Sequence, residues 1–569
     1  MSGNDTVNVP KRSDGEKEVE EPRFFDGETS DFEEGSEEQK EFIRKQAARV
    51  YDDKGVRKNQ RRFGKLLTLA YSSTKAAAIM LVAAIAALII ANTAAVEYFE
   101  LFLEFDIGFI FGETHVAMPI AEIINDIFMA VFFLLVGLEI KYEMTAGELT
   151  NIRQALLPII AAFGGVLAPI VIYSIFNAGS PDSAHGWGVP TATDIAFALG
   201  ILALLGNRVP NGVRVFLSTL AVADDIIAIV VIAVFYGQSP SFFWLACAAG
   251  VIVVLVIMNR LHIYAIAPYL LVGVVLWYCV FSSGVHSTIA GVLLAFTIPS
   301  GTRVKVSNFL KWSGEAVQKV EESYQPEVPV SSQGGYLEMA SVMSKIARQT
   351  IPPATRLERK LYPWVYFGIL PLFALTNANV TFIGGDFGAM ITSPVFFGVF
   401  FGLLLGKPIG IMLFSFVVIK TKLASLPENV NWVHMLGAAI LGGVGFTMAI
   451  FVANLAFPAH PELITNAKVA ILSASTLAGA IGFVFLMLQA KAAHARGVTY
   501  LTTTAPDATR QTAGAEAARN SADVLEGIDS PLVRQEIEAA QREKASSSAE
   551  VVVELGEDGT WSANDANGD

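Results

Sequence analysis

The sequence contains few cysteines and few charged residues for its length. Only two of its 569 residues are cysteines, Cys247 and Cys279, and both lie in apolar runs. Two cysteines placed in this way indicate neither a disulfide framework nor a metal site. Charged residues make up 16% of the chain, whereas hydrophobic residues make up 53%. A soluble domain does not need so many apolar runs of about twenty residues, so the composition indicates a polytopic membrane protein.

The formal net charge of -13 comes largely from the ends of the chain, notably from the acidic cluster between Glu16 and Glu41. It therefore says little about a ligand, and we expect no nucleic-acid partner. The N-terminal tail also lacks the apolar core of a signal peptide. The expected organisation has five parts, namely an acidic disordered tail with a basic end (1–65), transmembrane segments 1–8 (66–300), a cytoplasmic insertion (301–353), transmembrane segments 9–12 (354–491) and a polar disordered tail (492–569).

The apolar runs predict an all-α fold with about twelve transmembrane helices. The expected spans lie near residues 75–95, 120–140, 155–177, 190–205, 213–236, 243–259, 262–281, 284–299, 364–378, 394–419, 433–457 and 467–490. Lys and Arg gather before the first span and in the even-numbered connections, whereas the odd-numbered connections contain almost none. The positive-inside rule then predicts that both termini are cytoplasmic.

The first connection on the outer side has the pattern of a β-hairpin. Apolar residues alternate with small or polar ones from Phe105 to Met118, on both sides of Gly112 and Glu113. Two interpretations remain open: a hairpin that lies on its own protein, or one whose edge forms a homodimer contact.

Two adjacent aspartates, Asp224 and Asp225, lie in the middle of an apolar run from about Val215 to Phe235. A charge at the centre of a membrane helix costs ~2.5–3.5 kcal/mol even on the most lenient scale, so such residues indicate a functional site. We expect two further ionisable residues within spans, Asp194 and Lys407. Neighbours on a helix point about 100° apart, and we expect Asp225 to face a water-filled cavity.

Several interpretations of these charges compete. Lys407 could form a buried salt bridge that only holds helices together, but one lysine cannot neutralise three aspartates, and surplus carboxylates should bind a cation or protons. An intramembrane aspartyl protease would need two carboxylates that share a water molecule, whereas neighbouring aspartates diverge from one helix.

Two spans contain residues that interrupt a membrane helix. The fourth, Gly188–Gly206, contains Pro190, Thr193 and Asp194, and the eleventh, Leu436–Phe457, contains three glycines and a threonine near its middle. Ordinary helix packing explains such residues in one span. If spans 3–5 repeat as spans 10–12 in inverted orientation, however, the two interrupted spans match, and such pairs mark an ion site at the membrane midplane.

Several ordered motifs resemble the NhaA family of sodium/proton antiporters, from about Lys75 to Lys491 without the insertion. These motifs are Ile124–Glu143 (INDIFMAVFFLLVGLEIKYE), Pro190–Pro210 (PTATDIAFALGILALLGNRVP), the pair Asp224 and Asp225, Ser282–Val292 (SSGVHSTIAGV), Gly406–Gly410 (GKPIG) and Gly442–Phe451 (GGVGFTMAIF). The resemblance implies inverted repeats with two interrupted helices that cross near the ion site.

The resemblance also implies roles for individual residues. Asp224 and Asp225 would bind sodium, lithium or protons, with Thr193 beside them, and Asp194 and Lys407 would compensate the exposed helix ends. A set of residues matches positions linked to pH response, namely Glu139, Lys141, Glu143, His286 and Glu358. For the glutamates and Lys141 a solvated helix end is an equal alternative, and a loop histidine such as His286 is more often only hydrogen-bonded. The segment Arg356–Trp364 lacks the histidines of well-known members, which leaves the pH set point open.

The implied activity is an electrogenic, pH-dependent exchange of sodium or lithium for protons, by alternating access and driven by the inward proton gradient. No enzymatic activity and no cofactor besides the transported ions are expected. The protein would be a homodimer in the lipid bilayer of a prokaryotic cell membrane. The alternative on the same scaffold is a proton-coupled symporter of a small organic anion, whereas a channel would conduct without proton coupling.

Overall fold

The computed structural model describes residues 73–495, except 112–113, 151, 238–239, 382–386 and 428–429, together with 553–555 and 561–563. Residues 1–72, which include the tail expected to be disordered (1–65), and most of the C-terminal tail, also expected to be disordered, lie outside the described residues. Two short strands are described within that tail, β3 (Val553–Leu555) and β4 (Trp561–Ala563), and they pair antiparallel.

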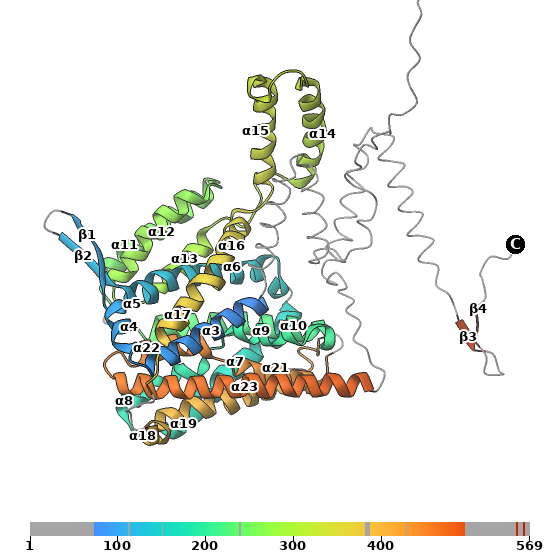
Figure 1. The fold of residues 1–569 in the computed structure, drawn as a ribbon. Helices are drawn as coiled ribbons and strands as arrows, with labels where there is room; N and C mark the ends of the chain where they lie inside the picture. Colours follow the sequence, from blue (N-terminus) through green and yellow to red (C-terminus); the bar gives the residue numbers. More distant parts are fainter. Residues whose placement is uncertain are drawn as a thin grey trace, which may run out of the picture. The chain divides into compact units, whose positions relative to one another are not determined.

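The described membrane part is helical, and each of the twelve predicted spans overlaps a helix or a group of helices (Figure 1). The first eight correspond to α3 (Ser73–Ala91), α6 (Met129–Thr145) with α5 (Ile120–Glu122) and η2 (Ile123–Phe128), α7 (Ile152–Asn177), η4 (His185–Thr191) with α9 (Ile195–Leu204), α10 (Asn211–Phe235), α11 (Phe242–Arg260), α12 (Ile266–Ser282) and α13 (Thr288–Thr297). The last four correspond to η7 (Val365–Ile369) with α17 (Leu370–Asn377), α19 (Pro394–Phe401) with η8 (Gly402–Gly406) and α20 (Lys407–Lys420), α21 (Trp432–Gly442) with α22 (Phe446–Ala456), and α23 (Pro461–Ala495).

Among the described residues, seven helices are long and apolar enough to cross a membrane, and nine if each of two bent pairs counts as one span. The apolar helices α12 and α13 are shorter. The chain is therefore an all-α polytopic membrane protein, as the composition predicted.

The two bent pairs are the spans that the sequence marked as interrupted. The axis bends by 42° between η4 and α9, and by 45° between α21 and α22. Ala192 and Asp194 are extended at the first break. The Asp194 backbone N–H donates to the Val444 carbonyl oxygen at 2.8 Å, which joins the first break to the second. The prediction of two interrupted, crossing helices is confirmed.

Close packing between helices fixes the position of the first break. Gly164 of α7 and Gly410 of α20 face each other, because a Cβ atom added at Gly410 would lie 2.0 Å from the Gly164 carbonyl oxygen. Likewise, a Cβ atom at Gly402 would lie 2.7 Å from the Pro190 side chain, just before the first break. Small residues allow the helix backbones to approach in lipid, where no hydrophobic driving force brings them together.

Two hairpins extend from the helical body. The strands β1 (Asp106–Phe111) and β2 (Thr114–Pro119) pair antiparallel, with Asp106 opposite Pro119, which confirms the predicted hairpin. In Figure 1 this hairpin lies at the left edge, next to α4 (Val96–Leu103), and the antiparallel pair α14 (Val306–Ser323) and α15 (Gly334–Gln349) rises at the top. This helical pair is the core of the insertion, and α16 (Pro353–Trp364) follows it. The remaining short segments are η3 (Glu148–Thr150), α8 (Pro181–Ala184), η5 (Gly206–Arg208), η6 (Val330–Ser332) and α18 (Phe387–Thr392).

The expectation that only four ionisable residues fall within spans is wrong. The span Ile120–Thr145 also contains Asp126, Glu139 and Lys141, and the span Pro461–Ala493 contains Lys468. Asp126 and Glu139 lie inside the predicted span 120–140, and Lys468 lies inside the predicted span 467–490, whereas Lys141 lies just beyond the predicted end because the helix is longer than predicted.

Candidate functional site

The two neighbouring aspartates of α10 point to different surroundings. Asp224 and Asp225 are each only 3% exposed. Asp224 Oδ2 accepts a hydrogen bond from Lys407 Nζ at 2.6 Å, within a buried ion pair. Asp225 instead lines a small cavity beside the crossing. The divergence of adjacent side chains on a helix accounts for this difference.

The cavity contains three carboxylates from three segments of the chain. Asp225 of α10, Asp194 at the first break and Glu139 of α6 all line it, together with Thr193 and Tyr366. Its volume is about 10 Å³, close to the space that one water molecule requires. A cavity of this size has room for one water molecule or one small dehydrated cation.

Asp194 binds the amino-terminal ends of two half-helices. Its Oδ1 accepts from the Phe197 backbone N–H at 3.1 Å and so caps α9. Its Oδ2 accepts from the Thr447 backbone N–H at 3.1 Å, in the first turn of α22, and from the Thr447 hydroxyl. A negative charge at these positions compensates the partly positive ends of both half-helices.

Thr193 and Lys407 lie at the carbonyl end of α21. The Thr193 hydroxyl donates to the Gly442 carbonyl oxygen at 3.0 Å and accepts a hydrogen bond from Lys407 Nζ. The lysine therefore reaches this partly negative helix end through the threonine hydroxyl. Lys407 is 1% exposed, and its ammonium group joins α20 to both α10 and the first break.

Two carboxylate oxygens remain available at the centre of the site. Asp224 Oδ1 and Asp225 Oδ1 are buried, and neither has a hydrogen-bond partner among the described residues. Within the same residues, no group of three His, Cys, Asp or Glu side chains converges as a metal site would. A cation in the cavity would meet the Asp225 carboxylate and neutral oxygens such as the Thr193 hydroxyl, which are the hard oxygen ligands that an alkali ion takes.

Of the residues expected to form a charged cytoplasmic group, Glu143 and Glu358 lie close enough to interact electrostatically, whereas Lys141 has other partners. Glu139 lines the cavity, and Glu143 follows one turn later on α6. Burial raises the pKa of Glu358 on α16; Arg359 opposes this shift, and Glu143 adds to it. Lys141 belongs elsewhere, because its ammonium group donates to the carbonyl oxygens of Ala295, Phe296 and Ile298 at the end of α13. It serves there as a helix cap.

His286 lies at the far end of the helix that carries the aspartate pair. Its Nε2 is 2.8 Å from the carbonyl oxygen of Tyr236, the C-cap residue that follows α10. The Tyr236 hydroxyl donates to the His185 carbonyl oxygen and accepts from the Gly188 backbone N–H, so it ties α10 to η4. Burial lowers the pKa of His286, an effect that this hydrogen bond and the nearby Asp126 partly oppose.

Sequence reasoning missed two polar features. Tyr366 lines the cavity, but it occurs in an otherwise aromatic and apolar segment that gave no sign of this position. A chain of amides also links three helical segments: Asn377 donates to Asn125 Oδ1 and accepts from Asn454, both at 2.8 Å. Asparagines within or beside three apolar spans were the available signal.

Comparisons with known proteins agree with the motifs. A family model described as Na+/H+ antiporter 1 matches residues 68–486. The chain is 40% identical over 434 residues to the Na(+)/H(+) antiporter NhaA of Wolinella succinogenes, a match that covers 75% of this chain and 93% of the relative. It is 43% identical over 423 residues to Na(+)/H(+) antiporter NhaA 2 of Flavobacterium johnsoniae, covering 74% and 92%.

Similarity to a solved structure is weaker. The sodium proton antiporter MjNhaP1 from Methanocaldococcus jannaschii at pH 8 aligns with a TM-score of 0.37 and 14% identity, over 77% of this chain and 97% of that chain. This likeness is too low to carry an argument about the site. The family assignment therefore rests on the sequence matches, which span most of the chain and nearly the whole length of these relatives. On these grounds the chain belongs to the NhaA family of sodium/proton antiporters.

Proposed function

We propose that this chain exchanges sodium or lithium for protons at Asp224 and Asp225, and that the inward proton gradient drives sodium out of the cell. The observation that carries the proposal is the pair of buried, unpartnered oxygens, Asp224 Oδ1 and Asp225 Oδ1, beside the crossing of the half-helices. The names of the relatives support the same exchange.

The physical basis is competition for buried carboxylates. A sodium ion that leaves water needs oxygen ligands and an opposing charge, and both are supplied by carboxylates in a low-dielectric site. A proton neutralises the same carboxylates, so protons and the cation compete for them. One site thus holds either ion, and exchange follows if it opens alternately to the two faces only when loaded.

Lys407 completes the cycle in this proposal. When Asp224 binds a cation, its contact with Lys407 is replaced, and the ammonium group can return when the cation leaves. Two carboxylates that release two protons for one monovalent cation would make the exchange electrogenic. A membrane potential that is negative inside would then accelerate sodium export.

We further propose a homodimer in a bacterial plasma membrane, with both termini cytoplasmic. The alternation of Lys and Arg between connections supports this orientation.

The two-stranded hairpin β1–β2 offers an edge for a second copy, because a strand edge carries unpaired backbone groups. Disulfide trapping of cysteines introduced at Ile107 in two copies would test this contact. If cysteines at other outer positions form dimers and the cysteine at position 107 yields only monomers, the contact is contradicted.

Proteoliposomes with a trapped pH dye test the exchange. Sodium or lithium added outside should enter as protons leave and so make the lumen alkaline, whereas potassium should not. Collapse of the potential with valinomycin and potassium should slow sodium export. A proton-coupled symporter would instead show uptake of an organic anion without sodium-dependent proton movement. Robust potassium-driven proton movement would also contradict the proposal.

A further inference from the structure

A basic cavity lies between the insertion and the membrane part of the chain. Its volume is about 530 Å³, within the range of small-molecule sites. Four of the side chains that line it are cations: Arg303 before α14, Lys345 and Arg348 on α15, and Arg356 on α16. The opposite wall is formed by Tyr264 and Ala265, in the connection before α12. The cavity therefore joins three segments that are distant in the sequence.

These positive charges meet no opposing charge from the part of the chain that the structure describes. Among those residues, no Asp or Glu lines the cavity and no ion pair involves any of its four cations. Burial is the main cause that lowers the pKa of Arg356, and the nearby positive charge of Arg348 lowers it further. Because like charges repel each other, a cluster of this kind is stable only if solvent or a bound anion compensates it.

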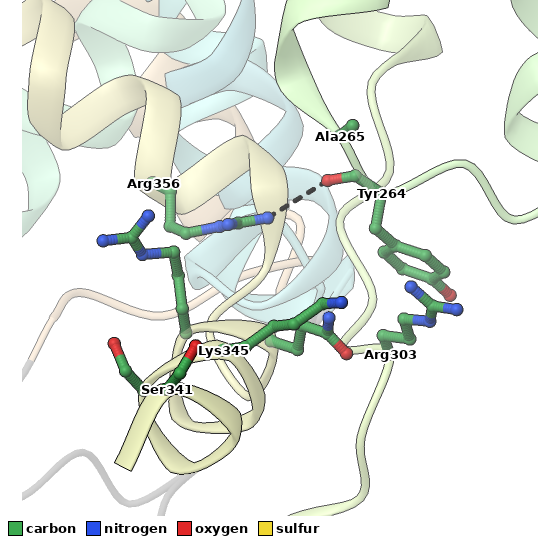
Figure 2. A pocket seen from close by; sticks show the side chains of 9 residues that line it. Tyr264, Ala265, Arg303, Ser341, Lys345 and Arg356 are labelled. Carbon is green, nitrogen blue, oxygen red and sulfur yellow. Dashed lines mark hydrogen bonds between the residues drawn. The ribbon is translucent and has the colours of Figure 1, made fainter. Parts of the chain in front are cut away.

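One member of the cluster is held in place. Arg356 Nη2 donates to the Tyr264 carbonyl oxygen at 3.1 Å, and its Nε is buried without a hydrogen-bond partner among the described residues. Figure 2 shows Arg356 and Lys345 extending from their helices toward the side on which Tyr264 lies. A guanidinium group that is fixed by a carbonyl loses less side-chain entropy when it binds a ligand.

We propose that this cavity binds an anion with two or more phosphate groups. Arginine guanidinium groups match phosphate oxygens in bidentate geometry, and lysine adds a mobile point charge. The hydroxyls of Ser341 and Ser344 also line the cavity and can donate to phosphate. Four cations exceed what a single carboxylate needs, whereas a diphosphate carries a charge of similar size and fits the volume.

The site is separate from the ion pathway. None of its residues lines the cavity at Asp225. Three of its four cations, Arg303, Lys345 and Arg348, belong to the insertion. A bound anion would neutralise the repulsion between α15 and α16 and fix the insertion to the connection before α12. The proposal thus goes beyond exchange of sodium for protons and does not depend on it.

Calorimetry with pyrophosphate tests the site in the full chain, held in nanodiscs of phosphatidylcholine. We expect saturable binding that weakens as salt increases. The double variant Lys345→Gln/Arg348→Gln should bind pyrophosphate at least about tenfold more weakly, because it loses two charge-assisted contacts. The matched control, Lys311→Gln/Lys319→Gln, removes two exposed charges from α14 outside the cavity and should bind as the unaltered chain does.

Further arms distinguish the source of the phosphate. If the ligand is a lipid headgroup, nanodiscs that contain an anionic diphosphate lipid should abolish pyrophosphate binding to the unaltered chain. The control variant Lys311→Gln/Lys319→Gln should show the same loss in these nanodiscs. If the ligand is soluble, binding should be equal in both membranes. Sodium-driven proton movement by the double variant verifies that it is folded. Lack of saturable pyrophosphate binding by the unaltered chain, or equal loss in the control variant, would overturn the proposal.

Discussion

Lys407 Nζ lies 2.6 Å from Asp224 Oδ2, and both side chains are almost completely buried, with exposed fractions of 1% and 4%. Burial of such a pair is costly unless the remaining donors and acceptors are satisfied. Lys407 meets this condition through Thr193, but Asp224 Oδ1 has no partner among the described residues. The pair is therefore well suited to exchange partners, which a purely structural ion pair would not need to do.

Neutral amides at the aspartate pair should stop transport. Asp225→Asn and Asp224→Asn preserve side-chain volume but can neither release a proton nor neutralise a cation, so each should abolish sodium-driven proton movement in proteoliposomes. Asp182→Asn, an exposed aspartate of α8, is the matched control and should transport normally. Retained exchange in both site variants, with normal insertion, would move the site elsewhere.

Replacing Lys407 by Met should destabilise the protein through Asp224. The variant leaves a buried carboxylate without its cation, a change that costs about 3–5 kcal/mol in buried pairs. The double variant Lys407→Met/Asp224→Asn removes both charges and should recover much of that stability. Thermal unfolding in detergent measures both effects. Strictly additive losses would show that the two side chains are not coupled.

The fold was largely predictable, because membrane helices follow from apolar length and interrupted helices from Pro, Gly and Thr in mid-span. The partners of individual side chains were not. Nothing in the sequence indicated that Lys141 would cap α13, or that Glu139 would line the same cavity as Asp225. These contacts depend on how distant helices rotate against one another, and single-sequence periodicity does not specify that rotation.

His286→Ala should extend activity to lower pH without abolishing exchange. The pKa of His286 is lowered from 6.5, mainly by burial, so the folded protein favours the neutral ring. That stabilisation is complete above pH 6.5 and is lost as the pH falls through the lowered pKa, where the ring becomes charged beside Tyr236. Exchange rates between pH 5 and 8 measure the shift. His460→Ala, an exposed histidine, should leave the profile unchanged, and an unchanged acid limb in His286→Ala would exclude this role.

Removal of the tails should leave transport intact. Neither residues 1–45 nor residues 500–569 contain a feature that binds ions, and the family match begins and ends inside these limits. A chain without both segments should therefore show the sodium-driven proton movement of the full chain. Loss of transport in a truncated protein that inserts normally would assign a function to one of the tails.

Competition between sodium and protons is the central claim, and the pH dependence of apparent sodium affinity tests it most directly. Initial rates should be measured over a range of sodium concentrations at each pH, in the unaltered chain and in Lys407→Met. Well below the relevant pKa values, apparent sodium affinity should fall about tenfold per pH unit for each proton displaced, and saturating sodium should restore the rate. A loss of activity in acid that saturating sodium cannot reverse would contradict competition and require a separate pH-driven switch.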